Sequence, residues 1–275
     1  MNRRDFLKTV AVPAALVEKS AKSCIFLKLV GGPSQLDTWD PKPDAPSRIR
    51  SPYRPIRTNV PGIEISELFP RMARHADKYA LIRSCYHTGE PVHGFSGWGL
   101  SDCGTAADRK RACTSFEQSC KSAVRAVASG QSLVVVNMFH SVHGQPTWDG
   151  HGFAPFSPMA AHCDHAAPMF DIAYMMLLAD LQNRDLLKTT LVVASGEFGR
   201  TPRINPAGGR DHWSQCWTMI MAGGGVQGGQ VIGSSDAIAA EPKDRPVSIA
   251  EIAATMRYVR GLPATSAQPV MELFR

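Results

Sequence analysis

The sequence of 275 residues lacks any apolar run as long as a membrane-spanning helix requires. It also lacks a basic run interleaved with aromatic residues, although the formal net charge is +6 and the pI is about 9.0. We therefore expect neither an integral membrane protein nor a partner of nucleic acid. A mild positive charge of this kind still favours anionic substrates.

Cysteine pairs at metal-ligand spacing are missing as well. The seven cysteines are an odd number, and no two of them form a Cys-x-x-Cys pair. The cysteines therefore indicate neither a zinc ribbon nor a fixed disulfide framework. In an oxidising compartment, Cys103, Cys113 and Cys120 are close enough in sequence for one bridge to form, if their geometry permits it.

What is present suits one α/β domain, since 44% of the residues are hydrophobic and 20% charged. Short β-rich runs alternate with segments of helical period, which predicts a mixed, mainly parallel sheet flanked by helices. The expected strands are 24–30, 80–83, 132–136 and 190–194, and the expected helices lie around 66–78, 115–129, 166–187 and 248–260.

A glycine-rich segment follows the apolar run 217–222 and formally satisfies Gly-x-Gly-x-x-Gly at 223–228. A dinucleotide fingerprint requires a helix next, but residues 229–233 are typical of a strand. The segment therefore predicts a tight hairpin.

The N-terminus carries Arg3 and Arg4 before Phe6-Leu7-Lys8 and the apolar segment 9–17, and so resembles a twin-arginine export signal. This pattern predicts a signal segment over 1–23, read by the twin-arginine export machinery, and a folded domain over 24–275 in the periplasm or at the cell surface. The alternative is an amphipathic first helix.

Carboxylates and imidazoles follow several of the predicted strands. The run 190–195 ends at Glu197, the pairs Asp149/His151 and Asp211/His212 lie in glycine-containing loops, and Asp37 follows the first strand. Open α/β sheets bind ligands at this carboxyl edge, and carboxylate with imidazole suits zinc or a similar divalent ion. Each residue alone could equally be a cap or an ion-pair partner. Their convergence would require a cation or a buried Arg, because clustered carboxylates repel one another.

Hydroxyl groups lie in the glycine-rich loop after the strand 80–83, where Thr88 and Ser96 have His87 and His93 nearby. The surroundings of Ser96 do not match a Gly-x-Ser-x-Gly nucleophile elbow. The alternative here is a flexible surface loop. Before the helix 166–187, His162 and His165 are expected to be capping or solvent-facing residues.

Five ordered motifs together resemble the domain of unknown function 1501 family: residues 31–43 (GGPSQLDTWDPKP), 59–67 (NVPGIEISE), 148–152 (WDGHG), 196–202 (GEFGRTP) and 209–213 (GRDHW). The resemblance implies an alkaline-phosphatase-like fold, which also houses sulfatases. It further implies a metal-dependent hydrolase of phosphate or sulfate esters, acting on an anionic small molecule or polysaccharide.

Carried over residue by residue, the resemblance implies the metal ligands Asp37, Asp149, His151, Glu197, Asp211 and His212. The ion would be zinc, calcium, magnesium or manganese. The catalytic candidates are Thr88 or Ser96 as nucleophile, with His93 and Arg200. The interval 104–115 is shorter than in typical family members. The alternative is therefore an inactive exported pseudoenzyme that binds anionic ligands or partner proteins on the same fold.

Overall fold

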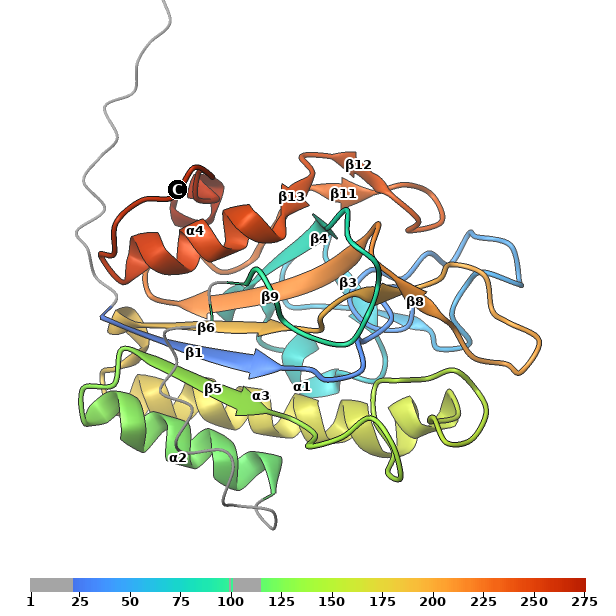
Figure 1. The fold of residues 1–275 in the computed structure, drawn as a ribbon, viewed down its shortest axis with the longest axis horizontal. Helices are drawn as coiled ribbons and strands as arrows, with labels where there is room; N and C mark the ends of the chain where they lie inside the picture. The colour runs from blue at the N-terminus through green and yellow to red at the C-terminus, as the bar shows by residue number, and fades with distance from the viewer. Residues whose placement is uncertain (1–21, 99, 101–114) are drawn as a thin grey trace, which may run out of the picture.

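A central sheet organises the chain in the computed structural model, which describes residues 22–98, 100 and 115–275 (Figure 1). The strand order is β10-β4-β9-β6-β1-β5, and β13 also pairs with β4. The strands are β1 (Ser23–Lys28), β4 (Ala80–Tyr86), β5 (Leu133–Asn137), β6 (Thr190–Ser195), β9 (Trp217–Gly223), β10 (Gln230–Ile232) and β13 (Val247–Ser248).

The sheet is mixed and mainly parallel, as the sequence predicts. Strand β1 pairs in parallel with β5 and β6, so that Ile25 lies between Val134 and Val192. Strand β9 is antiparallel to both β4 and β6. The expected strands at 80–83, 132–136 and 190–194 are confirmed.

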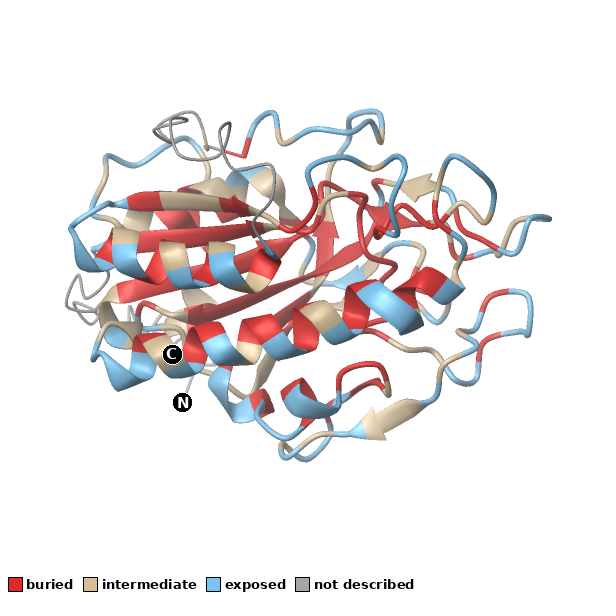
Figure 2. Cartoon of the chain, turned by 90° about the horizontal axis from the view of Figure 1, so that it is seen from below, coloured by how far each residue is buried: buried red, intermediate tan, exposed pale blue. Residues whose placement is uncertain are grey.

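Helices cover both faces of the sheet: α1 (Pro70–Ala73), α2 (Phe116–Ala128) and α3 (Ala167–Asn183) on one face, α4 (Ile249–Val259) on the other (Figure 1). Alternate β1 side chains serve the two faces. Ile25 and Leu27 join the core under α2 and α3, while Cys24 and Phe26 join the core under α4. The inward faces of α2 and α3 are accordingly buried and their outward faces exposed (Figure 2).

The prediction of one long helix over 66–78 is wrong. Residues Glu64–Ser66 form strand β3, which pairs with β2 (Pro55–Arg57), and only Pro70–Ala73 is α-helical before a 3₁₀ turn at Ala76–Lys78. Tertiary contacts override the helical period here. Proline suits a first helical turn, and the buried Asp171 side chain accepts hydrogen bonds from the backbone N–H groups of Arg71 and Met72.

The hairpin expected after 217–222 is also wrong, although a strand does follow. Strand β10 pairs in parallel with β4 instead of folding back on β9. Both edges of β9 are already occupied by β4 and β6, so no backbone groups remain for β10.

The other helices agree with expectation, and α4 begins with a capping box formed by Ser248 and Glu251. Short ladders complete the described chain: β7 (Gly199–Arg200) with β8 (His212–Trp213), and β11 (Ser234–Ser235) with β12 (Pro242–Asp244). Within the described ranges, no helix has the length and apolar character needed to cross a membrane. The predicted signal lies almost wholly outside the described residues, as do Cys103, Cys113 and nearly all of the interval 104–115.

Candidate metal centre

The site lies where loops leave one edge of the sheet. Strands β1, β5 and β6 are parallel, so their carboxyl ends at Lys28, Asn137 and Ser195 share that edge. Strand β4 runs the same way, because both it and β6 are antiparallel to β9. The loops that follow β4, β5 and β6 carry His93, Asp149 and Glu197, in keeping with ligand sites of open α/β sheets.

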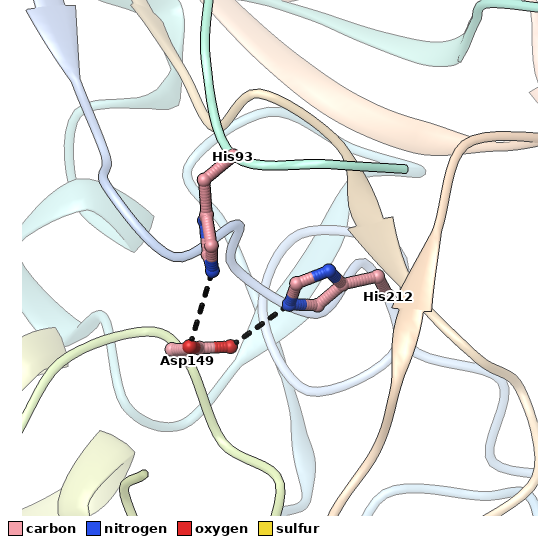
Figure 3. Close-up of side chains that lie close together, drawn as sticks. All are labelled: His93, Asp149 and His212. Atoms are coloured by element: carbon pink, nitrogen blue, oxygen red, sulfur yellow. Dashed lines mark hydrogen bonds and ion pairs between the residues drawn. The ribbon is translucent and has the colours of Figure 1, made fainter. Parts of the chain in front are cut away.

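Three histidines converge on the carboxylate of Asp149. His151 Nε2 and His212 Nε2 each lie 3.1 Å from Asp149 Oδ1, and His93 Nε2 lies 3.3 Å from Oδ2. Figure 3 shows His93, from a loop, and His212, from strand β8, pointing at Asp149. Ligand atoms of these three residues lie within 4.8 Å of one another, a spacing that could hold one metal ion.

Each imidazole is anchored through its other nitrogen. His93 Nδ1 lies 2.7 Å from Glu197 Oε1, His151 Nδ1 lies 2.8 Å from Asp211 Oδ1, and His212 Nδ1 lies 2.7 Å from the Pro91 carbonyl oxygen. A carbonyl or ionised carboxylate oxygen only accepts, so each Nδ1 carries the hydrogen. Three Nε2 atoms then face the Asp149 carboxylate, an arrangement typical of metal-binding histidines.

Two buried carboxylate oxygens at this point have no hydrogen-bond donor among the described residues, Asp149 Oδ2 and Glu197 Oε2. His93 is near the first, at 3.3 Å, but without hydrogen-bond geometry. Burial opposes ionisation of Asp149, yet hydrogen bonds with the histidines and the charge of Arg200 hold its pKa well below the ordinary value. Unsatisfied anionic oxygens beside imidazole nitrogens fit a cation.

Arg200 supports Asp149 from beneath. Its Nη2 donates to Asp149 Oδ1 at 2.5 Å, and its other nitrogens donate to the carbonyls of Gly32 and Arg210 at 3.0 Å. The side chain is fully buried, and β7 pairing places Arg200 opposite His212. Arg200, predicted as a catalytic candidate, therefore holds the Asp149 carboxylate in place in the structure.

Gly31 allows the loop after β1 to approach the backbone of Asp149 closely. Gly31 has φ +103°, and a Cβ there would lie 2.5 Å from the Asp149 backbone nitrogen. The Gly31 N–H donates to Glu197 Oε1 at 3.1 Å. A side chain at Gly31 would push apart two of the loops that carry the site.

Asp37 lies in a separate ion pair. Arg210 Nε and Nη2 donate to its two carboxylate oxygens at 2.8 and 3.2 Å, and both side chains are buried. Burial alone would raise the pKa of Asp37, but the charge and hydrogen bonds of Arg210 lower it. Of the six predicted ligands, Asp149 and four others lie in one cluster, namely His151, Glu197, Asp211 and His212. The sixth, Asp37, is held by Arg210.

A cleft of about 460 Å³ opens beside this cluster and contains both predicted hydroxyl candidates. Thr88 and Ser96 are exposed in it, together with His93 and Glu197. No Lys or Arg is among the described residues that line it. The hydroxyls therefore share the cleft with the cluster without a direct contact that would distinguish one of them.

His162 corrects an expectation: it is buried at 2% exposure, not capping or solvent-facing, and its Nε2 lies 3.3 Å from the Trp148 carbonyl oxygen. Burial lowers its pKa to about 4, so the ring is neutral. His165 is exposed as expected. The sequence linked His93 to the nucleophile and not to the ligands, because only the fold brings its loop to Asp149.

The metal-free protein is expected to lose stability as the pH rises. The neighbouring carboxylates of Asp149 and Glu197 raise the pKa of His93 to about 9 from 6.5. Its stabilising contribution is therefore complete below pH 6.5 and is lost as the pH rises through 9. Thermal unfolding in chelator should show this fall, and His93→Gln should flatten it. An unchanged slope in the variant would contradict the assignment.

Comparison with solved structures identifies the fold. The crystal structure of Ps i-CgsB matches with a TM-score of 0.50 at 11% identity, covering 92% of this chain and 76% of that one. BT4656 in complex with its substrate D-glucosamine-2-N,6-O-disulfate follows at 0.49, with 9% identity and coverages of 92% and 80%. A protein in the alkaline phosphatase superfamily from Vibrio parahaemolyticus scores 0.46, with 10% identity and coverages of 88% and 67%. The match to Ps i-CgsB shows that the chain shares the fold of that protein.

No protein with a curated description matches the sequence. One family model does match, over residues 21–106 and 99–268, and its description is protein of unknown function (DUF1501). These ranges contain every residue of the cluster around Asp149 and all five sequence motifs. The chain belongs to the DUF1501 family.

Proposed function

We propose that the protein is a metal-dependent hydrolase of phosphate or sulfate esters. The observation that supports this most directly is the convergence of three Nδ1-anchored imidazoles on one buried carboxylate. Packing in a protein core does not require three histidine Nε2 atoms to face the two carboxylate oxygens of one Asp. The alkaline-phosphatase-like fold agrees with this reaction class without specifying it.

The proposed ligands are His93, Asp149 and His212, with His151 and Glu197 beside them. Imidazole with carboxylate favours zinc over calcium or magnesium, which prefer oxygen ligands alone. A bound divalent ion would polarise the ester oxygens and neutralise their charge. Since the described cleft lining has no Lys or Arg, this charge would otherwise be uncompensated. Asp211 orients His151, and Asp37 is left to Arg210.

The chain's own residues would bind and orient the ester. The cleft offers either Thr88 or Ser96 as a nucleophilic hydroxyl. His93 is fixed by Glu197 at the entrance to the cluster, where it could hold a proton at Nε2 in the metal-free state. Arg200 keeps Asp149 in place from the buried side.

The test is the metal content of the purified full chain, together with hydrolysis of p-nitrophenyl phosphate and p-nitrophenyl sulfate. We expect Glu197→Gln and His212→Asn each to lower metal affinity and hydrolysis together by roughly 10- to 100-fold. The matched control His165→Asn removes an exposed histidine outside the cluster and should change neither. Thr88→Ala and Ser96→Ala, compared directly, identify the nucleophile.

Two results would refute this function in different ways. A wild-type protein that binds metal but hydrolyses neither ester would be a binding module on this fold. A wild-type protein without metal, or variants that lose activity while retaining full metal content, would refute the metal assignment itself.

We further propose that the protein is exported by the twin-arginine route to the periplasm or cell surface, on the evidence of Arg3 and Arg4. Replacing both with Lys should block export, measured by cell fractionation. Thermal unfolding of the purified domain should stay unchanged. A comparable loss of domain stability would instead make the N-terminal segment part of the fold.

A further inference from the structure

An exposed aromatic ring lies beside the cluster. Phe153 is 50% exposed and comes four residues after Asp149, in the loop that also carries His151. Single exposed apolar residues are common on protein surfaces and require no explanation alone. Phe153 differs because backbone hydrogen bonds connect its loop to Asp149, and aromatic contacts connect its ring to the cluster.

The backbone of this loop closes on Asp149. The Ser157 N–H donates to the Asp149 carbonyl at 3.0 Å, the Gly152 N–H donates to the Ser157 carbonyl at 3.0 Å, and the Phe156 N–H donates to the Phe153 carbonyl at 2.9 Å. Gly152 has φ +88°, and a Cβ there would lie 2.5 Å from the Ala207 carbonyl oxygen. The loop is therefore packed against its neighbour and fixed in shape.

A series of ring contacts connects the cluster to Phe153. The His212 and His151 ring centroids are 4.8 Å apart, and those of His151 and Phe156 are 4.5 Å apart. Phe156 meets Phe153 edge to face at 5.6 Å and 89°. The orientation of the exposed Phe153 ring is thus set by contacts that begin at a histidine of the cluster.

We propose that Phe153 is a specificity residue that stacks on a ring in the alcohol part of the ester. This rests on the proposed function, since the ester group itself would lie at Asp149 and the histidines. A pre-oriented aromatic ring supplies apolar contact at little entropic cost. Pyranose and aryl rings both present a flat apolar face, and small alkyl groups do not.

The experiment measures binding to the metal-loaded full chain by calorimetry. The probes are phenylphosphonate and a glucopyranose bearing a non-hydrolysable 6-phosphonate, with methylphosphonate as the ring-free reference. We expect Phe153→Ala to weaken binding of at least one ring-bearing probe roughly three- to tenfold. Binding of methylphosphonate should not change. The probe that loses more affinity tells an aryl ring from a sugar ring.

Two control variants keep the test specific. Phe153→Tyr retains the ring and should bind like the wild type, while Met176→Ala removes another exposed apolar side chain, on α3, and should have no effect. The melting temperature of each variant shows whether it is folded. If Phe153→Ala is unfolded, Phe153→Leu, which keeps apolar volume without a flat ring, serves in its place.

The outcomes separate this inference from the proposed function. The wild type could bind the ring-bearing probes more tightly than methylphosphonate, lose that preference in Phe153→Ala, and hydrolyse no ester. This result supports the ring site and refutes the proposed enzymatic function. Alternatively, the protein could hydrolyse esters but bind all three probes with equal affinity, or Phe153→Ala could lower the affinity for all three probes equally. Either result overturns the ring site and is compatible with the proposed enzymatic function. Binding of none of the probes by the wild type also overturns the ring site.

Discussion

Replacing Asp37 with alanine is expected to lower the free energy of unfolding by about 3–5 kcal/mol, because it leaves a buried guanidinium without its counter-charge. Asp37 is 0% exposed and Arg210 is 1% exposed, and two hydrogen bonds join them. Arg210 also donates to the carbonyls of Ile49 and Thr201, so the loss would loosen three segments together. Urea unfolding of the purified domain measures the change.

The matched control is Asp180→Ala on α3. Its ion pair with Arg184 has a similar distance, 2.7 Å, but the two side chains are 33% and 52% exposed. Water already solvates that pair, so we expect a loss of about 0.5 kcal/mol or less. A loss in Asp37→Ala no larger than in this control would contradict the ion-pair role. If Asp37 were a metal ligand instead, chelator would destabilise the wild type and not the variant.

Replacing Asp149 with asparagine is expected to lower metal affinity and ester hydrolysis by on the order of 100-fold or more, because a proposed ligand should contribute at least as much as the residues that orient ligands. Asparagine keeps the shape of the side chain but not the charge that three imidazoles and Arg200 share. The pKa of His93, raised to about 9 by the neighbouring carboxylates of Asp149 and Glu197, should fall toward 6.5. Elemental analysis, p-nitrophenyl phosphate turnover and NMR titration of the metal-free protein measure the three effects.

Asp211→Asn is the graded comparison for Asp149→Asn. Asp211 touches the cluster only through His151 Nδ1, and its side chain is 52% exposed. We expect roughly a tenfold loss of metal affinity, because an amide oxygen can still accept the His151 hydrogen. Equal losses in the two variants would show that Asp149 is not the centre of the cluster.

The alternation of apolar runs and helical periods was enough to predict the sheet, its parallel character and most of the flanking helices. Local rules also account for the capping box at Ser248 and Glu251, since it depends on residues three apart. They failed at 66–78 and at 223–233. There, pairing of β3 with β2 and of β10 with β4 joins backbone groups that the sequence does not relate locally.

The sequence by itself also placed Asp37, Asp149, His151, Glu197, Asp211 and His212 at the carboxyl edge of the sheet, because each lies in a segment next to an apolar strand. The clustering of carboxylates predicted that a cation or a buried Arg neutralises them. The tertiary structure decided which of these positive groups lies beside each carboxylate. Asp37 is paired with Arg210, 173 residues away, and Asp149 with Arg200 and three histidines. Only folding sets these distances, since a side chain's counter-charge depends on which loops share an edge and not on spacing along the chain.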